Sequence, residues 1–114
     1  MLKPNVLRRK KDFSVLYSKG KSVGDRYVVL FYKKNGLEYN RVAFLASKKV
    51  GNSVYRNRAR RLMKESYRQL ENSLEIGFDL IIIGRNTING TKCQDVYKSL
   101  LSAMKRAGVL KKTK

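Results

Sequence analysis

Basic side chains are concentrated in one stretch of this chain, residues 47–68, whose sequence is SKKVGNSVYRNRARRLMKESYR. Eight of these residues are Lys or Arg, and only Glu65 is acidic. Gly51 marks a tight turn ahead of a predicted helix, whose N-terminus offers free N–H groups to a phosphate. Side chains that neutralise phosphates release counterions and so bind a nucleic acid without reading its sequence. The stretch therefore predicts recognition of a phosphate-rich polymer.

An amphipathic helix is predicted to carry most of these cations. Its apolar residues recur at i, i+4, i+7, i+8, i+12 and i+15, and are Tyr55, Ala59, Leu62, Met63, Tyr67 and Leu70. On the other side, like charges four residues apart, such as Arg60 with Lys64, cost about a few tenths of a kcal/mol per pair. A charged helix face is ordinarily only solvated, but here almost no acid is present to balance it. This face therefore indicates an anionic partner.

The composition of the whole chain points to the same partner. Its 114 residues include 27 Lys and Arg against 8 Asp and Glu, which gives a net charge of +19. Such self-repulsion destabilises a compact monomer, and a nucleic acid relieves it. A hydrophobic fraction of 42% is too high for a disordered tail. A membrane partner is disfavoured, because no apolar run approaches the roughly 20 residues of a span and the N-terminus lacks a secretory signal.

Residue types also exclude several kinds of active site. The chain has no His and one Cys, Cys93, so it predicts neither an internal disulfide nor a zinc site and suits a reducing, cytoplasmic setting. The lack of His removes the commonest general base near neutral pH. A self-sufficient nuclease is disfavoured, since no clustered acid pair offers a metal or acid–base site. We expect a structural role for Asp79 and a buried or half-buried place for Cys93.

The N-terminal half contains the first elements that must position the basic helix. Residues 1–11 are expected to form a flexible basic arm. A short helix follows, from a cap at Asp12 to a stop at Gly20. Residues 26–32 and 41–46 predict two strands, which we expect to pair as an antiparallel hairpin.

After the basic helix, residues 78–84 form a nearly unbroken apolar run, typical of a central strand covered on both faces. Thr91 and Gln94 predict a capping box for a last helix that ends near Gly108. Residues 109–114 are expected to be a flexible basic tail. The order of elements predicts one α+β domain over residues 1–114, a mixed sheet of about four strands with three helices packed on it.

The central motif also resembles a known family. Arg56-Asn57-Arg58, preceded by SKKVGNSV at residues 47–54 and followed by Arg60-Arg61, resembles the signature of the bacterial ribonuclease P protein component. The resemblance covers nearly the whole chain. Further matching positions are Asp12-Phe13, Tyr17, Gly20, Arg26 with the strand to Tyr32, Arg41-Val42 and the run from Phe78 to Arg85.

The resemblance implies an accessory subunit that binds a catalytic RNA, one protein monomer per RNA. In that family the RNA holds the active site and the Mg²⁺ ions, and removes the 5′ leader of precursor tRNA. The protein contacts the leader and strengthens binding of substrate and metal. We therefore expect no catalytic residue and no metal ligand in this chain. The implied fold is an α/β sandwich with a left-handed β-α-β crossover around the basic helix, against the general rule of right-handedness.

The family's functional residues map onto two groups of positions in this sequence. The residues implied to bind RNA are Lys48, Lys49, Asn52, Arg56, Asn57, Arg58, Arg60, Arg61, Lys64 and Arg68. Those implied to form the cleft for the single-stranded leader are Phe13, Tyr17, Phe31, Arg56, Asn57 and Arg60. Aromatic faces stack on unpaired bases, which agrees with a leader cleft. For the three aromatic residues, packing in the core is the alternative.

The functional alternative is a ribosomal or RNA-chaperone protein that binds structured RNA without a role in cleavage. The effect of the protein on cleavage by the catalytic RNA discriminates between the two.

Overall fold

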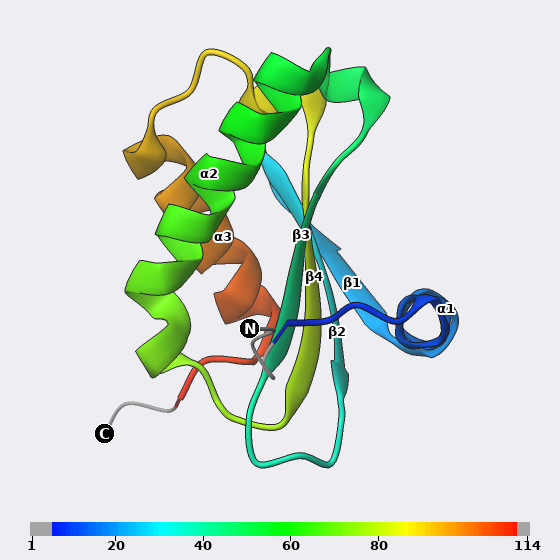
Figure 1. Cartoon of the computed structure of the whole chain (residues 1–114). Helices are drawn as coiled ribbons and strands as arrows, with labels where there is room; N and C mark the ends of the chain where they lie inside the picture. Colours follow the sequence, from blue (N-terminus) through cyan, green and yellow to red (C-terminus); the bar gives the residue numbers. More distant parts are fainter. Residues whose placement is uncertain (1–5, 112–114) are drawn as a thin grey trace.

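The computed structural model describes residues 6–111, which fold as a four-stranded sheet with helices on both faces (Figure 1). The strands are β1 (Lys21–Gly24), β2 (Val28–Lys34), β3 (Arg41–Ala46) and β4 (Phe78–Gly84), and the α-helices are α1 (Lys10–Lys19), α2 (Ser53–Leu70) and α3 (Cys93–Ala107). Short 3-10 turns are η1 (Lys48–Val50), η2 (Glu71–Ser73) and η3 (Asn86–Ile88). Helices α2 and α3 cover one face of the sheet, and α1 lies on the other.

The strand order is β1-β2-β4-β3, so the predicted hairpin between residues 26–32 and 41–46 is wrong. β4 lies between them, antiparallel to β2 and parallel to β3. Its residues Leu80, Ile81 and Ile82 are fully buried, and the most apolar strand takes the central place because both its faces are covered. Strand β1 is not among the predicted strands, because it is short, polar and mostly exposed.

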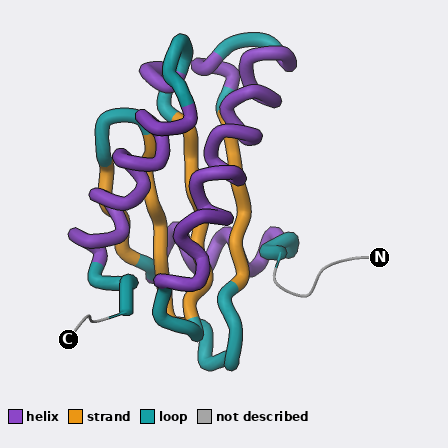
Figure 2. The backbone as a smooth tube through the Cα atoms, turned by 90° about the vertical axis from the view of Figure 1, so that its left-hand side faces the viewer, coloured by secondary structure: helices purple, strands orange, loops and turns teal. Residues whose placement is uncertain are grey.

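Parallel strands β3 and β4 are joined through α2, which confirms the β-α-β unit around the basic helix. The left-handed sense of that crossover stays a prediction from the family resemblance. Figure 2 shows α2 and α3 side by side in front of the strands. The larger core lies between these two helices and the sheet, and includes Leu30, Met63, Leu80, Ile82 and Leu100.

Close packing of α2 on the sheet depends on Gly84 at the end of β4. A Cβ at this position would lie 3.3 Å from the Met63 methyl carbon and 3.6 Å from the Ala59 Cβ. The side chain that fills this space is Met63, which is fully buried. A glycine in the strand thus lets the helix approach the sheet.

The apolar stripe predicted for α2 is confirmed at Ala59, Met63, Tyr67 and Leu70, all of which are buried. The prediction is wrong for Tyr55, which is 51% exposed. This residue lies in the first turn of the helix, where its ring packs over the glycine turn: a Cβ on Gly51 would lie 3.0 Å from a Tyr55 ring carbon.

Helix α1 begins at Lys10, two residues before the predicted cap at Asp12. Asp12 lies in the first turn, where its carboxylate faces the Arg41 guanidinium at 3.4 Å. The helix ends at Gly20 as predicted. Here a Cβ would lie 2.4 Å from the Leu16 carbonyl oxygen, so only glycine fits.

Helix α3 begins one residue later than the predicted capping box requires. The Asp95 carboxylate accepts a hydrogen bond from the Lys92 N–H at 2.9 Å, whereas the Thr91 hydroxyl donates to the Ile88 carbonyl. The cap therefore uses positions 92 and 95 rather than 91 and 94. The helix ends at Gly108 with φ 74°, in the left-handed region that favours glycine.

Parts of the predicted arm and tail are fixed on the body of the protein. Leu7 is buried, and its N–H donates to the Val42 carbonyl at 3.1 Å. At the other end Val109 is buried and Leu110 forms a β-bridge with Leu74. The predicted flexibility is therefore wrong for these residues, while residues 1–5 and 112–114 lie outside those described. Within residues 6–111, no helix is long and apolar enough to cross a membrane.

Candidate nucleic-acid interface

The cations of the predicted RNA surface are presented by the turn η1 and the helix α2. The Asn52 side-chain oxygen caps α2, accepting from the N–H groups of Val54 at 3.1 Å and Tyr55 at 3.3 Å. This cap fixes the direction of the helix relative to the exposed lysines of η1, Lys48 and Lys49. Because its side-chain oxygen caps α2, Asn52 contributes to the surface by fixing the helix N-terminus.

Four of the predicted contact residues follow each other at intervals of four along α2: Arg56, Arg60, Lys64 and Arg68. The first three lie on one side of the helix. The Asn57 side-chain oxygen accepts a hydrogen bond from the Arg60 guanidinium at 2.7 Å, which orients that group. Arg56 Nε is buried and has no hydrogen-bond partner among the described residues. This side of the helix therefore presents guanidinium groups that no carboxylate holds.

Two predicted contact residues are partly engaged within the protein. The Arg58 guanidinium donates to the Thr91 carbonyl oxygen, so it points toward the loop before α3. Arg68 forms an ion pair with Glu65, three residues earlier in the same helix. The hydrogen bond from Arg68 and its charge lower the pKa of Glu65. Among residues 6–111, none of the other predicted basic contact residues forms an ion pair within 4.0 Å.

The three aromatic residues of the predicted cleft lie together on the α1 side of the sheet. The ring centroids of Phe13 and Tyr17 are 6.5 Å apart, and those of Tyr17 and Phe31 are 4.9 Å apart in an edge-to-face arrangement. Tyr17 is 45% exposed, and partial burial raises the pKa of its hydroxyl. Phe13 and Phe31 are half-buried and pack against a small core that includes Leu16 and Ile81. The cluster is thus partly packed and partly open.

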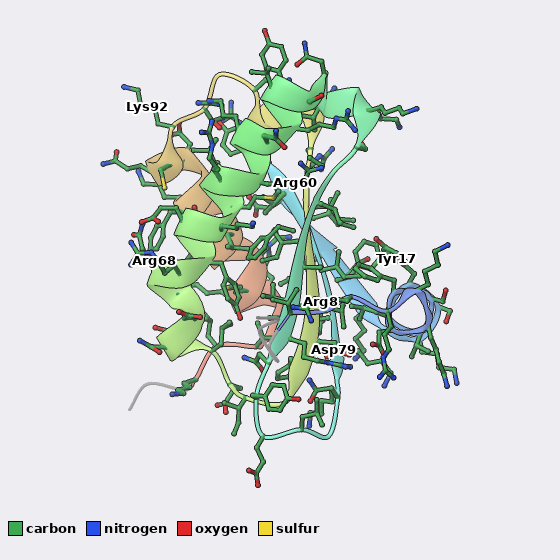
Figure 3. The ribbon with its side chains drawn as sticks, in the orientation of Figure 1. Arg8, Tyr17, Arg60, Arg68, Asp79 and Lys92 are labelled. Atoms are coloured by element: carbon green, nitrogen blue, oxygen red, sulfur yellow. The ribbon has the colours of Figure 1, made fainter. Side chains whose placement is uncertain are left out.

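A groove of about 770 Å³ joins this aromatic side to the cationic side of α2 across the edge strand β3. Phe13 and Leu45 line one side, and Arg60 and Lys64 line the other. Arg8, on the chain segment that crosses β3, also lines it. Figure 3 shows Arg8 on the segment in front of the sheet, below Arg60 of α2 and to the left of Tyr17 of α1. An apolar floor with cations at its side suits a single-stranded nucleic acid, whose bases and phosphates face different ways.

The groove brings together only part of the predicted cleft. Phe13 and Arg60 line it, whereas Tyr17, Phe31, Arg56 and Asn57 do not. Arg8 belongs to the predicted basic arm, residues 1–11, but is not among the predicted site residues. Its place at the groove depends on the pairing of the preceding segment with β3, for which the sequence has no local signal.

A polar network joins α1 to the sheet through Asp12, whose carboxylate lies 3.4 Å from the Arg41 guanidinium of β3, and Arg41 is held in turn by Asp79 of β4. The Asp79 carboxylate accepts from Arg41 Nε at 2.8 Å, Arg41 Nη2 at 2.7 Å and Asn35 Nδ2 at 2.9 Å. The hydrogen bonds and charge of Asp79 raise the pKa of Arg41 despite its burial. Asp79 thus has the structural role expected of it. Across residues 6–111, no three His, Cys, Asp or Glu side chains gather as possible metal ligands.

Cys93 is half-buried as expected, at the start of α3. Its sulfur lies 3.8 Å from the Ser66 hydroxyl.

Comparison with known proteins decides the family. The family model for ribonuclease P matches residues 1–108. The chain belongs to the ribonuclease P protein family. A ribonuclease P protein component from Clostridium botulinum (strain Langeland) is 42% identical over 109 residues, covering 95% of this chain and 98% of the relative. That of Alkaliphilus metalliredigens is 38% identical over 102 residues, covering 90% and 92%.

Solved structures of ribonuclease P proteins have the same fold. The Staphylococcus aureus RNase P protein matches with a TM-score of 0.85 and 28% identity, over 96% of this chain and all of that one. The Thermotoga maritima protein matches with a TM-score of 0.80 and 30% identity, over 89% and 96%. The predicted mixed sheet with three helices is confirmed.

Family membership gives this chain the role of protein subunit of ribonuclease P in tRNA 5′ processing, with the ribonuclease P RNA as its partner. The predicted role as the protein subunit of ribonuclease P is confirmed, and no comparison favours the RNA-chaperone alternative.

Proposed function

We propose that α2 docks this protein on the catalytic RNA of ribonuclease P and that the groove beside it receives the 5′ leader of precursor tRNA. The active site and its Mg²⁺ ions belong to the RNA in this proposal. One protein monomer serves one RNA, and no side chain of this chain takes part in the chemical step.

The observation that carries this proposal is the groove between Phe13 and the cations Arg60 and Lys64. Stacking on an aromatic side chain stabilises an unpaired base by about 1–3 kcal/mol. The guanidinium and ammonium groups on the opposite side neutralise the phosphates that connect such bases. A single-stranded leader has both features, whereas a paired RNA helix has its bases stacked inside.

Docking on the catalytic RNA is supported by the cations of η1 and α2 that make no ion pair. Lys48 and Lys49 are exposed at the start of this surface, and Tyr55 lies exposed next to Arg56 in the first turn of α2. We assign Tyr55 to the docking surface as a platform for a base. Its ring is held in place over Gly51, so little conformational entropy is lost on stacking.

Reconstitution tests where the active site lies. The protein alone is expected to leave precursor tRNA uncut at any Mg²⁺ concentration. Added to the cognate catalytic RNA, it is expected to lower the Mg²⁺ concentration needed for half-maximal cleavage, because it neutralises phosphates that Mg²⁺ otherwise screens. Cleavage by the protein alone would place an active site in this chain. An unchanged Mg²⁺ requirement would contradict the proposed role.

Replacement of Phe13 by alanine tests the leader groove. We expect affinity of the reconstituted enzyme for precursor tRNA to fall about tenfold, because one base loses its aromatic partner. Affinity for leaderless tRNA should stay unchanged. Tyr97→Ala on α3, a half-buried aromatic residue remote from the groove, is the matched control. Equal losses for both substrates in the Phe13 variant would instead assign this ring to packing.

A further inference from the structure

A second hollow, of about 370 Å³, lies on the α3 side of the sheet where that helix ends. Tyr32 of β2 and Phe78 of β4 line it, and Gly108 lies at its wall. The two aromatic residues lie on adjacent strands and on the same face: Tyr32 opposes Leu80 and Phe78 opposes Lys34. Both rings are half-buried and pack against the margin of the larger core. Because α3 ends at Ala107, it leaves part of each ring uncovered.

Lysines surround these two rings. Lys21 of β1 lies directly opposite Tyr32, and Lys34 of β2 lies directly opposite Phe78. Directly opposed residues share a face with their Cβ atoms about 5 Å apart, so a lysine side chain starts beside each ring. Lys19 and Lys33 also line the hollow.

The positive charge of this hollow is balanced only in part. Lys33 lies directly opposite Asp79 in the sheet, and Lys33 and Lys34 also line a neighbouring pocket with Asp12 and Asp79. Among the described residues that line it, none is acidic. In every ion pair within residues 6–111 the cation is an arginine, so none of the four lysines forms one. Like charges at this spacing destabilise the folded protein, and an anion placed among them reverses that cost.

The wall that α3 provides is fixed in place. Near its C-terminal end, the Arg106 guanidinium donates to the Gly24 carbonyl at 2.8 Å and pairs with the Asp25 carboxylate at 2.5 Å. The Ser99 hydroxyl donates to the same carboxylate at 2.7 Å. Burial raises the pKa of Asp25, but the hydrogen bonds that it accepts outweigh burial and lower it. The hollow is therefore preformed, and little conformational entropy of the protein is lost when a ligand binds.

We infer that this hollow is a second binding site for single-stranded RNA, with a base on Tyr32 and Phe78 and the flanking phosphates on Lys21 and Lys34. It lies toward the β1–β2 edge of the sheet, whereas the leader groove crosses β3 at the opposite edge. The two sites are therefore separate. An unpaired base with flanking phosphates is found both in an unpaired loop of the catalytic RNA and in a distal part of a long leader.

The first test uses hexauridylate as the probe, titrated at low salt into the full-length protein and followed by NMR of the backbone amides. We expect shifts at residues 19–21, 32–34 and 107–108, in addition to those at Phe13 and Arg60. The Lys21→Gln/Lys34→Gln variant should lose the first set and keep the second. Lys98→Gln/Lys105→Gln removes the same charge from exposed positions of α3 and should keep both sets. No shifts at the hollow, or equal losses in both variants, would overturn the inference.

A second variant separates stacking from charge. Tyr32→Leu keeps every lysine and an apolar side chain at position 32. The apparent affinity for hexauridylate, taken from the shifts at the hollow, should fall about tenfold. Wild-type affinity in this variant would contradict the aromatic platform. Because the leader groove is read out at Phe13 and Arg60, failure of this inference is distinguishable from failure of the proposed function.

Two further arms identify the source of the RNA. If the hollow binds the catalytic RNA, Lys21→Gln/Lys34→Gln lowers affinity for that RNA about tenfold, with or without substrate. If it binds the distal leader, only affinity for precursor tRNA with a long leader falls. Wild-type affinity in both arms would show that neither RNA uses the hollow and would overturn its assignment as a functional site.

Discussion

Replacing Arg56 and Arg60 together by alanine is expected to weaken binding of the catalytic RNA about 100-fold at moderate salt. A hydrogen bond to a charged group contributes about 1.5–3 kcal/mol, so two lost contacts cost at least about 3 kcal/mol. Arg60 is held by Asn57, and the Arg56 guanidinium has no carboxylate partner, so neither residue is needed for an ion pair in the free protein. The loss should therefore appear in binding and not in folding.

Salt dependence shows whether these arginines contact phosphate. Each lost phosphate contact should reduce the slope of log affinity against log salt by up to about one unit. Arg26→Ala/Lys98→Ala removes the same charge from exposed positions away from α2, and should change the slope little. If the two double variants lose affinity and slope equally, general attraction accounts for binding and the proposed docking surface is wrong.

Replacing Asp79 by alanine is expected to destabilise the protein by about 2 kcal/mol. Its carboxylate is 13% exposed and pairs with Arg41, which is 23% exposed. Loss of one partner from a fully buried pair costs about 3–5 kcal/mol, and partial exposure of Arg41 reduces that value. Among residues 6–111, the change leaves the guanidinium with Asp12 as its one carboxylate partner, at 3.4 Å. The midpoint of thermal unfolding should fall by about 10 °C.

Two other variants make this prediction specific. Asp12→Ala removes the longer and more exposed contact, and should cost about 0.5 kcal/mol in urea unfolding. Arg41→Met combined with Asp79→Ala should recover part of the loss, because the half-buried guanidinium is then no longer left without Asp79, while Asp12 loses only its longer contact of 3.4 Å. Equal effects of the two aspartate variants, or no recovery in the double variant, would contradict the assigned role of the network.

The parts of the fold that sequence reasoning predicted correctly depend on neighbouring residues. The run at 78–84 is apolar enough to require a central strand, and α2 follows from residues spaced along a single helix. Gly20 and Gly108 end their helices for local reasons. The wrong predictions concern partners far apart in the sequence: nothing in residues 26–46 indicates that β4 will separate β2 from β3.

In the candidate site too, the predictions from neighbouring residues are better than those that depend on distant parts of the chain. The residues of α2 were predicted from one continuous motif, and the structure presents most of them together. Arg58 looks identical to Arg56 in the sequence, yet its guanidinium is bound to a carbonyl brought there by the loop before α3. Tyr55 continues the apolar spacing, yet the turn at Gly51 leaves it exposed. The groove itself combines α1, β3, α2 and the segment at Arg8, an arrangement set only by tertiary packing.

The central position of β4 has a consequence for how the protein is made. During synthesis β3 and α2 leave the ribosome before their common neighbour exists, so the basic helix has no sheet core to pack on. Contacts between distant parts of the chain form late and slowly, and domains fold as their chains are completed. The proposed docking surface is thus assembled only after β4, which ends at Gly84, has also left the ribosome. Until then, the newly made chain exposes a strongly basic helix without its support, beside the RNA of the ribosome itself.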